Sequence, residues 1–153
     1  MRLALYQPDI PQNLGAAIRL CACLNLGLDV IEPCGFPLTD RSLRRAALDY
    51  GEAARITRHD SLAAFSRAAA ETNARLVLVE TDGATSFQDF AFSSGDILVL
   101  GRESAGSPGE LYAAAHASVR VPMKTGMRSL NVVVAGAVVL TEAMRQTGAW
   151  EKF

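Results

Sequence analysis

The sequence predicts an α/β fold with a mainly parallel sheet covered by helices on both faces. Short apolar segments typical of buried strands alternate along the chain with segments in which apolar residues recur at helical spacing. Turn-forming Pro, Gly, Asp and Asn residues bound the apolar segments, and the connections between them are long enough to hold helices. Strand–helix–strand units of this kind imply parallel pairing and right-handed crossovers.

Length and composition indicate one globular domain over residues 1–153. Apolar residues make up 50% of the chain and charged residues 20%, which excludes a disordered or fibrous protein. The longest uncharged apolar run, 132–140, is far shorter than the roughly 20 residues of a membrane span. The first residues lack the apolar region of a signal peptide. We therefore expect a cytoplasmic protein with no membrane role, and reduced, buried thiols at Cys21, Cys23 and Cys34.

The first third of the chain is expected to contain a strand–helix–strand unit and a short helix. These elements are a strand over 2–6, a helix capped by Asn13 and stopped by Gly27, a strand over 28–32, and a short helix capped by Thr39 or Asp40.

The remaining elements continue the alternation. They are a weak strand over 53–57, a helix from Asp60 or Ser61, a strand over 75–81, an irregular segment over 86–92, a strand over 96–100, a helix to about 115 and a strand over 118–121. Ser107 to Glu110 reads Ser-Pro-Gly-Glu, which fits a capping box. The last helix is expected from Ser129 or Asn131 to Gln146. Its valines leave a strand over 132–135 as an alternative, but its length and polar end favour a helix.

Three loops qualify as a binding site, because ligands of open parallel sheets bind beyond the carboxyl ends of the strands. The loops cover 81–83, 101–106 and 122–131. The glycines of the second loop fit neither a dinucleotide fingerprint nor a P-loop. Backbone groups and small residues dominate, which suits a neutral, flat ligand such as an adenosine. Glu103 is the carboxylate of the glycine loop, and composition alone leaves open whether it is functional or a charge at a helix entry.

Other kinds of site find little support. His59 and His116 lack carboxylate or Cys neighbours at ligand spacing, so no metal site is expected. No serine lies in a hydrolase setting. The net charge of −1 neither requires nor forbids a polyanionic partner. The cluster formed by Arg41, Arg44 and Arg45 is either a solvated helix face or a phosphate contact, and charge alone favours the former.

Several motifs resemble one enzyme class. Asn13-Leu14-Gly15-Ala16-Ala17-Ile18-Arg19, Leu100-Gly101-Arg102-Glu103-Ser104-Ala105-Gly106, and Val121-Pro122-Met123 with Ser129-Leu130-Asn131 are similar to the three motifs of the SPOUT class of RNA 2′-O-methyltransferases. Segments 32–36 and 43–50 resemble the short single-domain branch that methylates the wobble ribose of tRNA, on cytidine or a modified uridine. The resemblance covers nearly the whole chain.

The resemblance implies S-adenosylmethionine as methyl donor, a homodimer, the tRNA anticodon stem-loop as substrate, and a deep trefoil knot in the C-terminal part of the fold. Knots are exceptions to ordinary connection rules, so periodicity does not predict one. The motif positions expected to bind the cofactor are Val79, Gly101, Gly106, Val121, Met123, Ser129 and Leu130.

The resemblance also implies catalytic roles. Arg19 matches the arginine proposed as proton acceptor, although a guanidinium with a pKa above about 12 resists deprotonation. Arg19 is therefore either a base or a group that binds phosphate or polarises the hydroxyl, in the same subunit or its partner. Asn13, Glu103 and Asn131 match the polar positions that orient it and the substrate. The arginine cluster 41–45 and Arg128 become expected RNA contacts.

Two departures bear on the substrate. Val133 stands where relatives usually have a small hydroxyl residue, and Thr141 stands where an aromatic residue is common. Two alternatives are therefore kept: a 2′-O-methyltransferase acting on another tRNA or ribosomal RNA site, and a non-catalytic RNA-binding knotted dimer.

Overall fold

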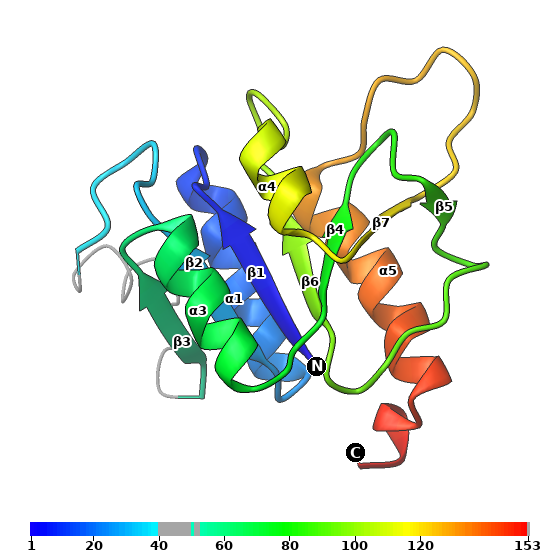
Figure 1. The fold of residues 1–153 in the computed structure, drawn as a ribbon, viewed down its shortest axis with the longest axis horizontal. Coiled ribbons are helices and arrows are strands. Elements are labelled where there is room, and N and C mark those ends of the chain that lie inside the picture. The colour runs from blue at the N-terminus through cyan, green and yellow to red at the C-terminus, as the bar shows by residue number, and fades with distance from the viewer. Residues whose placement is uncertain (40–49, 51–52, 153) are drawn as a thin grey trace.

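A computed structural model describes residues 1–39, 50 and 53–152 of the chain (Figure 1). Arg41, Arg44, Arg45 and the short helix predicted after Asp40 lie outside the described residues. Within the described part, all strands join one parallel sheet in the order β3-β2-β1-β6-β4-β7-β5. The strands are β1 (Arg2–Tyr6), β2 (Gly27–Ile31), β3 (Arg55–His59), β4 (Leu76–Val79), β5 (Thr85–Ser86), β6 (Ile97–Leu100) and β7 (Ala117–Arg120).

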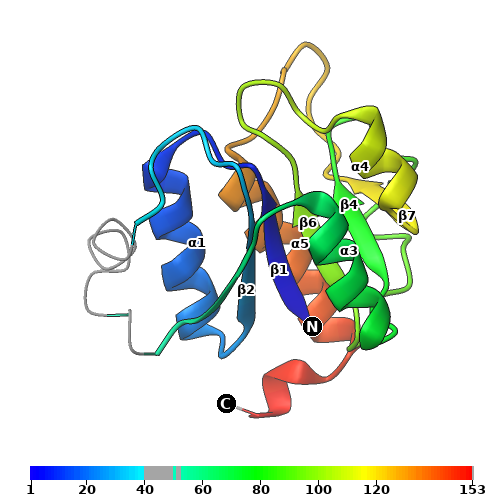
Figure 2. The ribbon, with the colours of Figure 1, turned by 60° about the vertical axis from the view of Figure 1, so that its left-hand side comes forward.

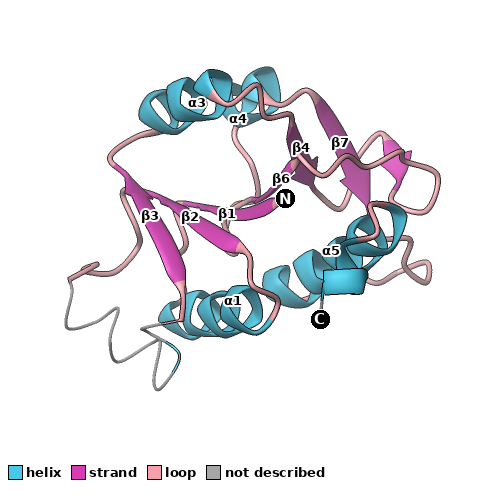
Figure 3. Ribbon diagram, turned by 90° about the horizontal axis from the view of Figure 1, so that it is seen from below, coloured by secondary structure: helices cyan, strands magenta, loops and turns pink. Residues whose placement is uncertain are grey.

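Helices cover both faces of the sheet, as predicted (Figure 3). Helices α1 (Pro11–Cys23) and α5 (Val132–Gln146) lie on one face, and α3 (Leu62–Glu71) and α4 (Gly109–Ala114) lie on the other. A 3₁₀ helix over Ala149–Lys152 follows α5. Alternate residues of β1 point to opposite faces, so Leu3 and Leu5 join the core under α1 and α5 while Ala4 and Tyr6 join the other. A sheet buried on both faces explains the continuous apolar runs of the central strands.

The strand order brings the three predicted loops together. Strand β6 lies between β1 and β4, and β4 pairs with β7 on its other side. Because these strands are parallel, the loops that follow β4, β6 and β7 lie at the same end of the sheet, and Figure 1 shows them there. Figure 2 shows the amino end of α5 at this end as well, while both chain termini lie at the opposite end.

The last helix confirms the prediction and excludes the strand alternative for 132–135. Asn131 is its N-cap, and Asn131 Oδ1 accepts from the backbone N–H groups of Val133 at 3.0 Å and Val134 at 3.3 Å. The low helix propensity of valine is overridden because the helix buries one face against the sheet, with Val133, Val139 and Leu140 in the core. Ser61 caps α3 in the predicted manner.

The predicted boundaries of α1 are wrong. The helix begins at Pro11, and Asn13 lies inside it with its side chain bonded elsewhere. Proline is favoured at the first helical position because it needs no hydrogen bond there. At the other end the helix stops at Cys23, and Asn25, with φ at 50°, provides the left-handed turn expected of Gly27.

The capping box before α4 is also wrong. Pro108 is the N-cap, and the Ser107 hydroxyl donates to the Glu80 carboxylate instead of accepting from the helix. Glu110 accepts from the Tyr6 hydroxyl at 2.8 Å. Both side chains have tertiary partners, so neither caps the helix.

Smaller differences concern strand edges and buried groups. Strand β3 begins two residues later than predicted, and the two-residue β5 includes Ser86, which was expected to be irregular. Cys21 is buried, which raises its pKa to about 12, but Cys23 is exposed, because residues two apart point to different sides of a helix. His59 has a carboxylate partner after all, since Asp29 of the neighbouring strand lies 2.7 Å from its ring nitrogen.

No helix in the part of the chain that the structure describes is long and apolar enough to cross a membrane.

Candidate active site

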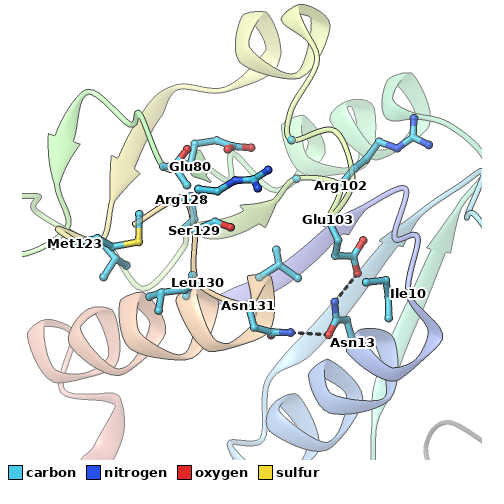
Figure 4. Close-up of a pocket in the computed structure, with 17 residues that line it drawn as sticks. Ile10, Asn13, Glu80, Arg102, Glu103, Met123, Arg128, Ser129, Leu130 and Asn131 are labelled. Carbon is cyan, nitrogen blue, oxygen red and sulfur yellow. Dashed lines mark hydrogen bonds between the residues drawn. The ribbon is translucent and has the colours of Figure 1, made fainter. Parts of the chain in front are cut away.

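A cavity of about 530 Å³ opens at the carboxyl ends of β4, β6 and β7 (Figure 4). All three predicted loops contribute to it, together with the amino ends of α1 and α5. The seven residues predicted to bind a cofactor all line it: Val79, Gly101, Gly106, Val121, Met123, Ser129 and Leu130. Its volume falls in the range of small-molecule sites, and its lining mixes apolar side chains with a few polar groups.

A chain of hydrogen bonds joins the three motifs along one wall of the cavity. Asn131 Nδ2 donates to Asn13 Oδ1 at 2.9 Å, and Asn13 Nδ2 donates to Glu103 Oε1 at 2.9 Å (Figure 4). The other oxygen of Glu103 accepts from the backbone N–H of Asp9 at 2.7 Å. Because Asn131 Oδ1 also caps α5, each amide in the chain has its orientation determined by its neighbours.

Glu103 is a structural acceptor in this network. Both of its oxygens accept from N–H donors, the pattern of an ionised carboxylate. It lies well before α4, which begins at Gly109, so it is not a charge at a helix entry.

Asp9 fastens the same loop from the other side. Its carboxylate accepts from the Ser104 hydroxyl, the Ser104 backbone N–H at 3.2 Å and the Arg102 guanidinium at 3.3 Å. These bonds, that of the Ser104 hydroxyl above all, hold the pKa of Asp9 below its ordinary value. The segment after β1 and the loop after β6 are therefore clasped together beside the cavity.

The loop over 101–106 closes tightly on itself. The backbones of Arg102 and Gly106 exchange hydrogen bonds at 3.1 and 2.9 Å, and Gly106 has a φ of 65°. At Gly101 a Cβ would come within 2.5 Å of Glu80 Oε1 and would also collide with the Ser107 hydroxyl. Close approach of these side chains, rather than a phosphate-binding turn, therefore explains the glycine at 101.

Among the predicted site residues that the structure describes, Arg19 lies outside the cavity. It lies on the exposed side of α1, about 9 Å along the helix axis from Asn13, and its guanidinium packs over the Tyr50 ring at 5.2 Å. It does not line the cavity of its own chain. Arg128, predicted to contact RNA, does line it.

Some lining residues were not predicted as site residues. Thr81 and Arg102 lie in the predicted loops but were given no role there, and Ile10, Glu80, Val132 and Ala135 lie outside those loops. Glu80 could have been found from its position as a carboxylate at the carboxyl end of an apolar strand, next to Val79.

Both departures from the family pattern can now be placed. Val133 is buried and its backbone is part of the α5 cap. The Thr141 hydroxyl bonds to Ala137 O of its own helix at 2.7 Å, and Trp150 Nε1 lies 3.4 Å from Thr141 O.

In the described ranges no three His, Cys, Asp or Glu side chains are arranged to hold a metal ion. His116 Nδ1 accepts from the Leu76 backbone N–H at 3.0 Å.

Comparisons with known proteins give a consistent result. The model of the SpoU rRNA Methylase family matches residues 1–141. A tRNA (cytidine(34)-2′-O)-methyltransferase of Beijerinckia indica is 53% identical over 150 residues, which cover 98% of this chain and 94% of the relative.

Solved structures share the fold. A structure described as giving insights into the 2-OH methylation of C/U34 on tRNA superposes with a TM-score of 0.87 at 41% identity, over 95% of this chain and 94% of the other. The SpoU methyltransferase AviRb from Streptomyces viridochromogenes, solved in complex with the cofactor AdoMet, superposes with a TM-score of 0.82 at 27% identity, over 95% of this chain and 60% of the other.

Proposed function

The chain belongs to the SpoU rRNA methylase family, and we propose that it transfers a methyl group from S-adenosylmethionine to the ribose 2′-hydroxyl of the wobble nucleotide of tRNA. The observation that carries this proposal is the identity of 53% over almost the full length of a tRNA (cytidine(34)-2′-O)-methyltransferase. The neighbouring structure concerned with C/U34 supports the same nucleotide, as cytidine or a modified uridine.

The pocket fits the proposed cofactor. Its volume suits a nucleoside with an amino-acid tail. The AdoMet complex of AviRb supports the same assignment. When bound, the cofactor would supply a methyl group on a sulfonium, which leaves as a neutral thioether. The residues proposed to hold the cofactor are Val79, Gly101, Gly106, Val121, Met123, Ser129 and Leu130.

The polar wall would position the substrate. A ribose hydroxyl must lie in line with the methyl group and lose its proton as the new bond forms. One hydrogen-bonded network joins Asn13, Glu103 and Asn131, and its geometry is set before the substrate binds. The network would orient the incoming hydroxyl and the residue that accepts its proton or polarises it.

Arg19 is proposed to act on the pocket of a second copy. It is exposed and lies outside the pocket of its own chain, so a homodimer would have to bring it to the site. Because a guanidinium resists deprotonation, its role would be to bind a phosphate or polarise the 2′-hydroxyl rather than to act as a free base.

Exposed apolar side chains support the homodimer. Val134 and Val138 lie one turn apart on α5 and are 51% and 36% exposed, and Trp150 is 40% exposed. A second copy would remove this surface from water.

The remaining proposals concern the RNA and the chain path. We propose that the anticodon stem-loop is contacted by four arginines, Arg41, Arg44, Arg45 and Arg128. The reaction is proposed to take place in the cytoplasm. Residues 1–153 are proposed to act as one SPOUT domain with a C-terminal trefoil knot. An experimental density map would test the knot by the path of 122–131.

Two experiments test the function. Purified protein is expected to bind S-adenosylhomocysteine in calorimetry, and failure to bind at high micromolar ligand would refute both catalytic readings. Incubation with S-adenosylmethionine and unmethylated RNA then distinguishes the substrates: a new 2′-O-methyl at the tRNA wobble nucleotide supports the proposal, and one at another tRNA or ribosomal site supports the alternative.

A further inference from the structure

Glu80 is a carboxylate in the pocket that the proposed mechanism does not use. It follows β4 directly and lines the cavity near Arg128 and Ser129, on the side away from Asn13 (Figure 4). We propose that Glu80 binds the ribose hydroxyls of the methyl donor and makes the site selective for a nucleoside with an intact cis-diol. This inference rests on the proposed function, since it presumes that the pocket binds an adenosine-containing donor.

The Glu80 side chain is held before any ligand binds. Its backbone N–H donates to Val119 O at 3.0 Å, and its carbonyl accepts from Gly83 N at 3.3 Å, so the backbone is anchored on both sides. The Ser107 hydroxyl donates to Oε1, which limits the rotation of the carboxylate. A preorganised acceptor loses little side-chain entropy when a ligand binds.

The second oxygen remains open to the cavity. Among the described residues Oε2 accepts no hydrogen bond. Gly106, which also lines the cavity, has no side chain to cover it, and a Cβ built there would lie 3.9 Å from it. Glu103, the other carboxylate lining the cavity, already accepts from Asp9 and Asn13. Glu80 is therefore the carboxylate with capacity for a ligand.

The ligand chemistry follows from what a carboxylate accepts. A ribose cis-diol presents two adjacent O–H donors, and carboxylates beyond the carboxyl ends of parallel strands bind such hydroxyls in dinucleotide-binding folds. Each hydrogen bond to a charged acceptor contributes about 1.5 to 3 kcal/mol, or roughly 10- to 100-fold in affinity. A deoxynucleoside would leave Glu80 without a partner and would be rejected by that factor.

Calorimetry with deoxy analogues tests this inference. S-adenosylmethionine, S-adenosylhomocysteine and the 2′-deoxy and 3′-deoxy forms of S-adenosylhomocysteine would be titrated into wild type, Glu80→Ala, Glu80→Gln and a control, Asp82→Asn. Asp82 is in the same loop and carries the same charge, but it does not line the cavity and bonds to the Tyr112 hydroxyl at 2.7 Å. Wild type and the Asp82→Asn control should bind at least one deoxy form about 10- to 100-fold more weakly than they bind S-adenosylhomocysteine. Glu80→Ala should bind S-adenosylhomocysteine more weakly than wild type does, by a similar factor. This variant should then show little difference in affinity between S-adenosylhomocysteine and its deoxy forms.

Three outcomes would overturn the inference while leaving the proposed function intact. Wild type could bind both deoxy forms as tightly as the parent compound. Glu80→Ala could discriminate as strongly as wild type. Glu80→Gln could weaken S-adenosylmethionine alone, which would assign Glu80 to the sulfonium charge. If wild type binds no S-adenosylhomocysteine, the proposed function fails and this inference fails with it. Glu80→Gln preserves the side-chain shape, so it keeps the test decisive if the alanine variant does not fold.

Discussion

The amide of Asn131 donates to the side-chain oxygen of Asn13 over 2.9 Å, although the two residues are 118 positions apart. Asn131 caps the last helix, and Asn13 lies in the first helix and donates to Glu103. One hydrogen-bonded chain therefore couples the amino ends of both helices to the glycine loop. A change at one member should disturb the others.

Asn13→Asp is expected to break this chain. The new carboxylate would face Glu103 with no proton to donate and would place two like charges at a buried position, where Asn13 is 7% exposed. We predict a loss of about 3 kcal/mol in the free energy of unfolding, measured by urea titration. Gln12→Glu adds the same charge at the neighbouring exposed position and should change stability by less than about 0.5 kcal/mol. Equal effects would show that the buried network contributes nothing.

Glu103→Gln tests whether catalysis depends on the same wall. A glutamine has one acceptor oxygen where Glu103 uses two, so the N–H of Asp9 or the amide of Asn13 loses its partner. Misplacement of the polar groups should lower kcat about 100-fold, while binding of S-adenosylhomocysteine changes little. A wild-type rate in this variant would refute the proposed site.

Arg19→Ala should lower methyl transfer about 100-fold without loss of fold, because the side chain is exposed. Co-expression of the Arg19→Ala chain with the Glu103→Ala chain, followed by a methyl-transfer assay of the mixed dimers, decides which subunit supplies the arginine. If Arg19 acts across a dimer, mixed dimers contain one intact site and activity reappears. If it acts within its own chain, both sites of a mixed dimer stay defective and no activity returns.

Asp9→Asn should reduce stability in a pH-dependent way. The pKa of Asp9 is lowered in the folded state by the Ser104 hydroxyl and Arg102, so its stabilisation is present above the unfolded pKa of about 3.9 and is lost as the pH falls through the folded pKa. Unfolding titrations should therefore show a loss of about 1 kcal/mol near pH 7. The loss should shrink below about pH 3. Asp89→Asn, at an exposed position, serves as control. A loss of stability in Asp9→Asn that does not depend on pH would contradict the role assigned to the hydrogen bonds of Asp9.

Gly101→Ala should weaken cofactor binding. The added methyl group would collide with Glu80, which lines the cavity, and with Ser107, which holds the Glu80 carboxylate, so this wall of the cavity would have to shift. We predict at least a tenfold rise in the Kd for S-adenosylhomocysteine, since overpacking costs about 1 to 3 kcal/mol. Gly95→Ala is a matched control, because nothing lies within 4 Å of its added Cβ. Unchanged binding in both variants would place the cofactor elsewhere.

Local pattern predicted most elements but not the ends that depend on distant partners. The central strands were found because burial on both faces leaves continuous apolar runs, and Asn131 was recognised as a cap because its side chain bonds within its own helix. Asn13 and Ser107 could cap a helix equally well, but Asn13 donates to Glu103 and Ser107 donates to Glu80 instead. These partners are distant in the sequence, so a local pattern does not reveal them.

The strand pattern predicted the three loops of the site, but the cofactor and the individual residues expected to bind it came from motif resemblance. Neither the strand order, in which β6 enters between β1 and β4, nor the contact of 122–131 with the other loops is encoded in any local pattern. Glu80 belonged to no motif, and its position at the carboxyl end of an apolar strand is the one sequence signal for its place in the pocket. The role proposed for Arg19 depends on a second copy, so neither the sequence nor the fold of one chain predicts it.

Methylation of the wobble ribose is the central claim, and mapping of 2′-O-methyl groups in tRNA tests it most directly. Transfer RNA from cells that lack this protein would be incubated with purified protein and S-adenosylmethionine, then analysed nucleotide by nucleotide. The account predicts a 2′-O-methyl at the wobble nucleotide that is absent before incubation and absent with Glu103→Gln. Protein that binds S-adenosylhomocysteine but leaves the wobble ribose of every tRNA unmethylated would contradict it.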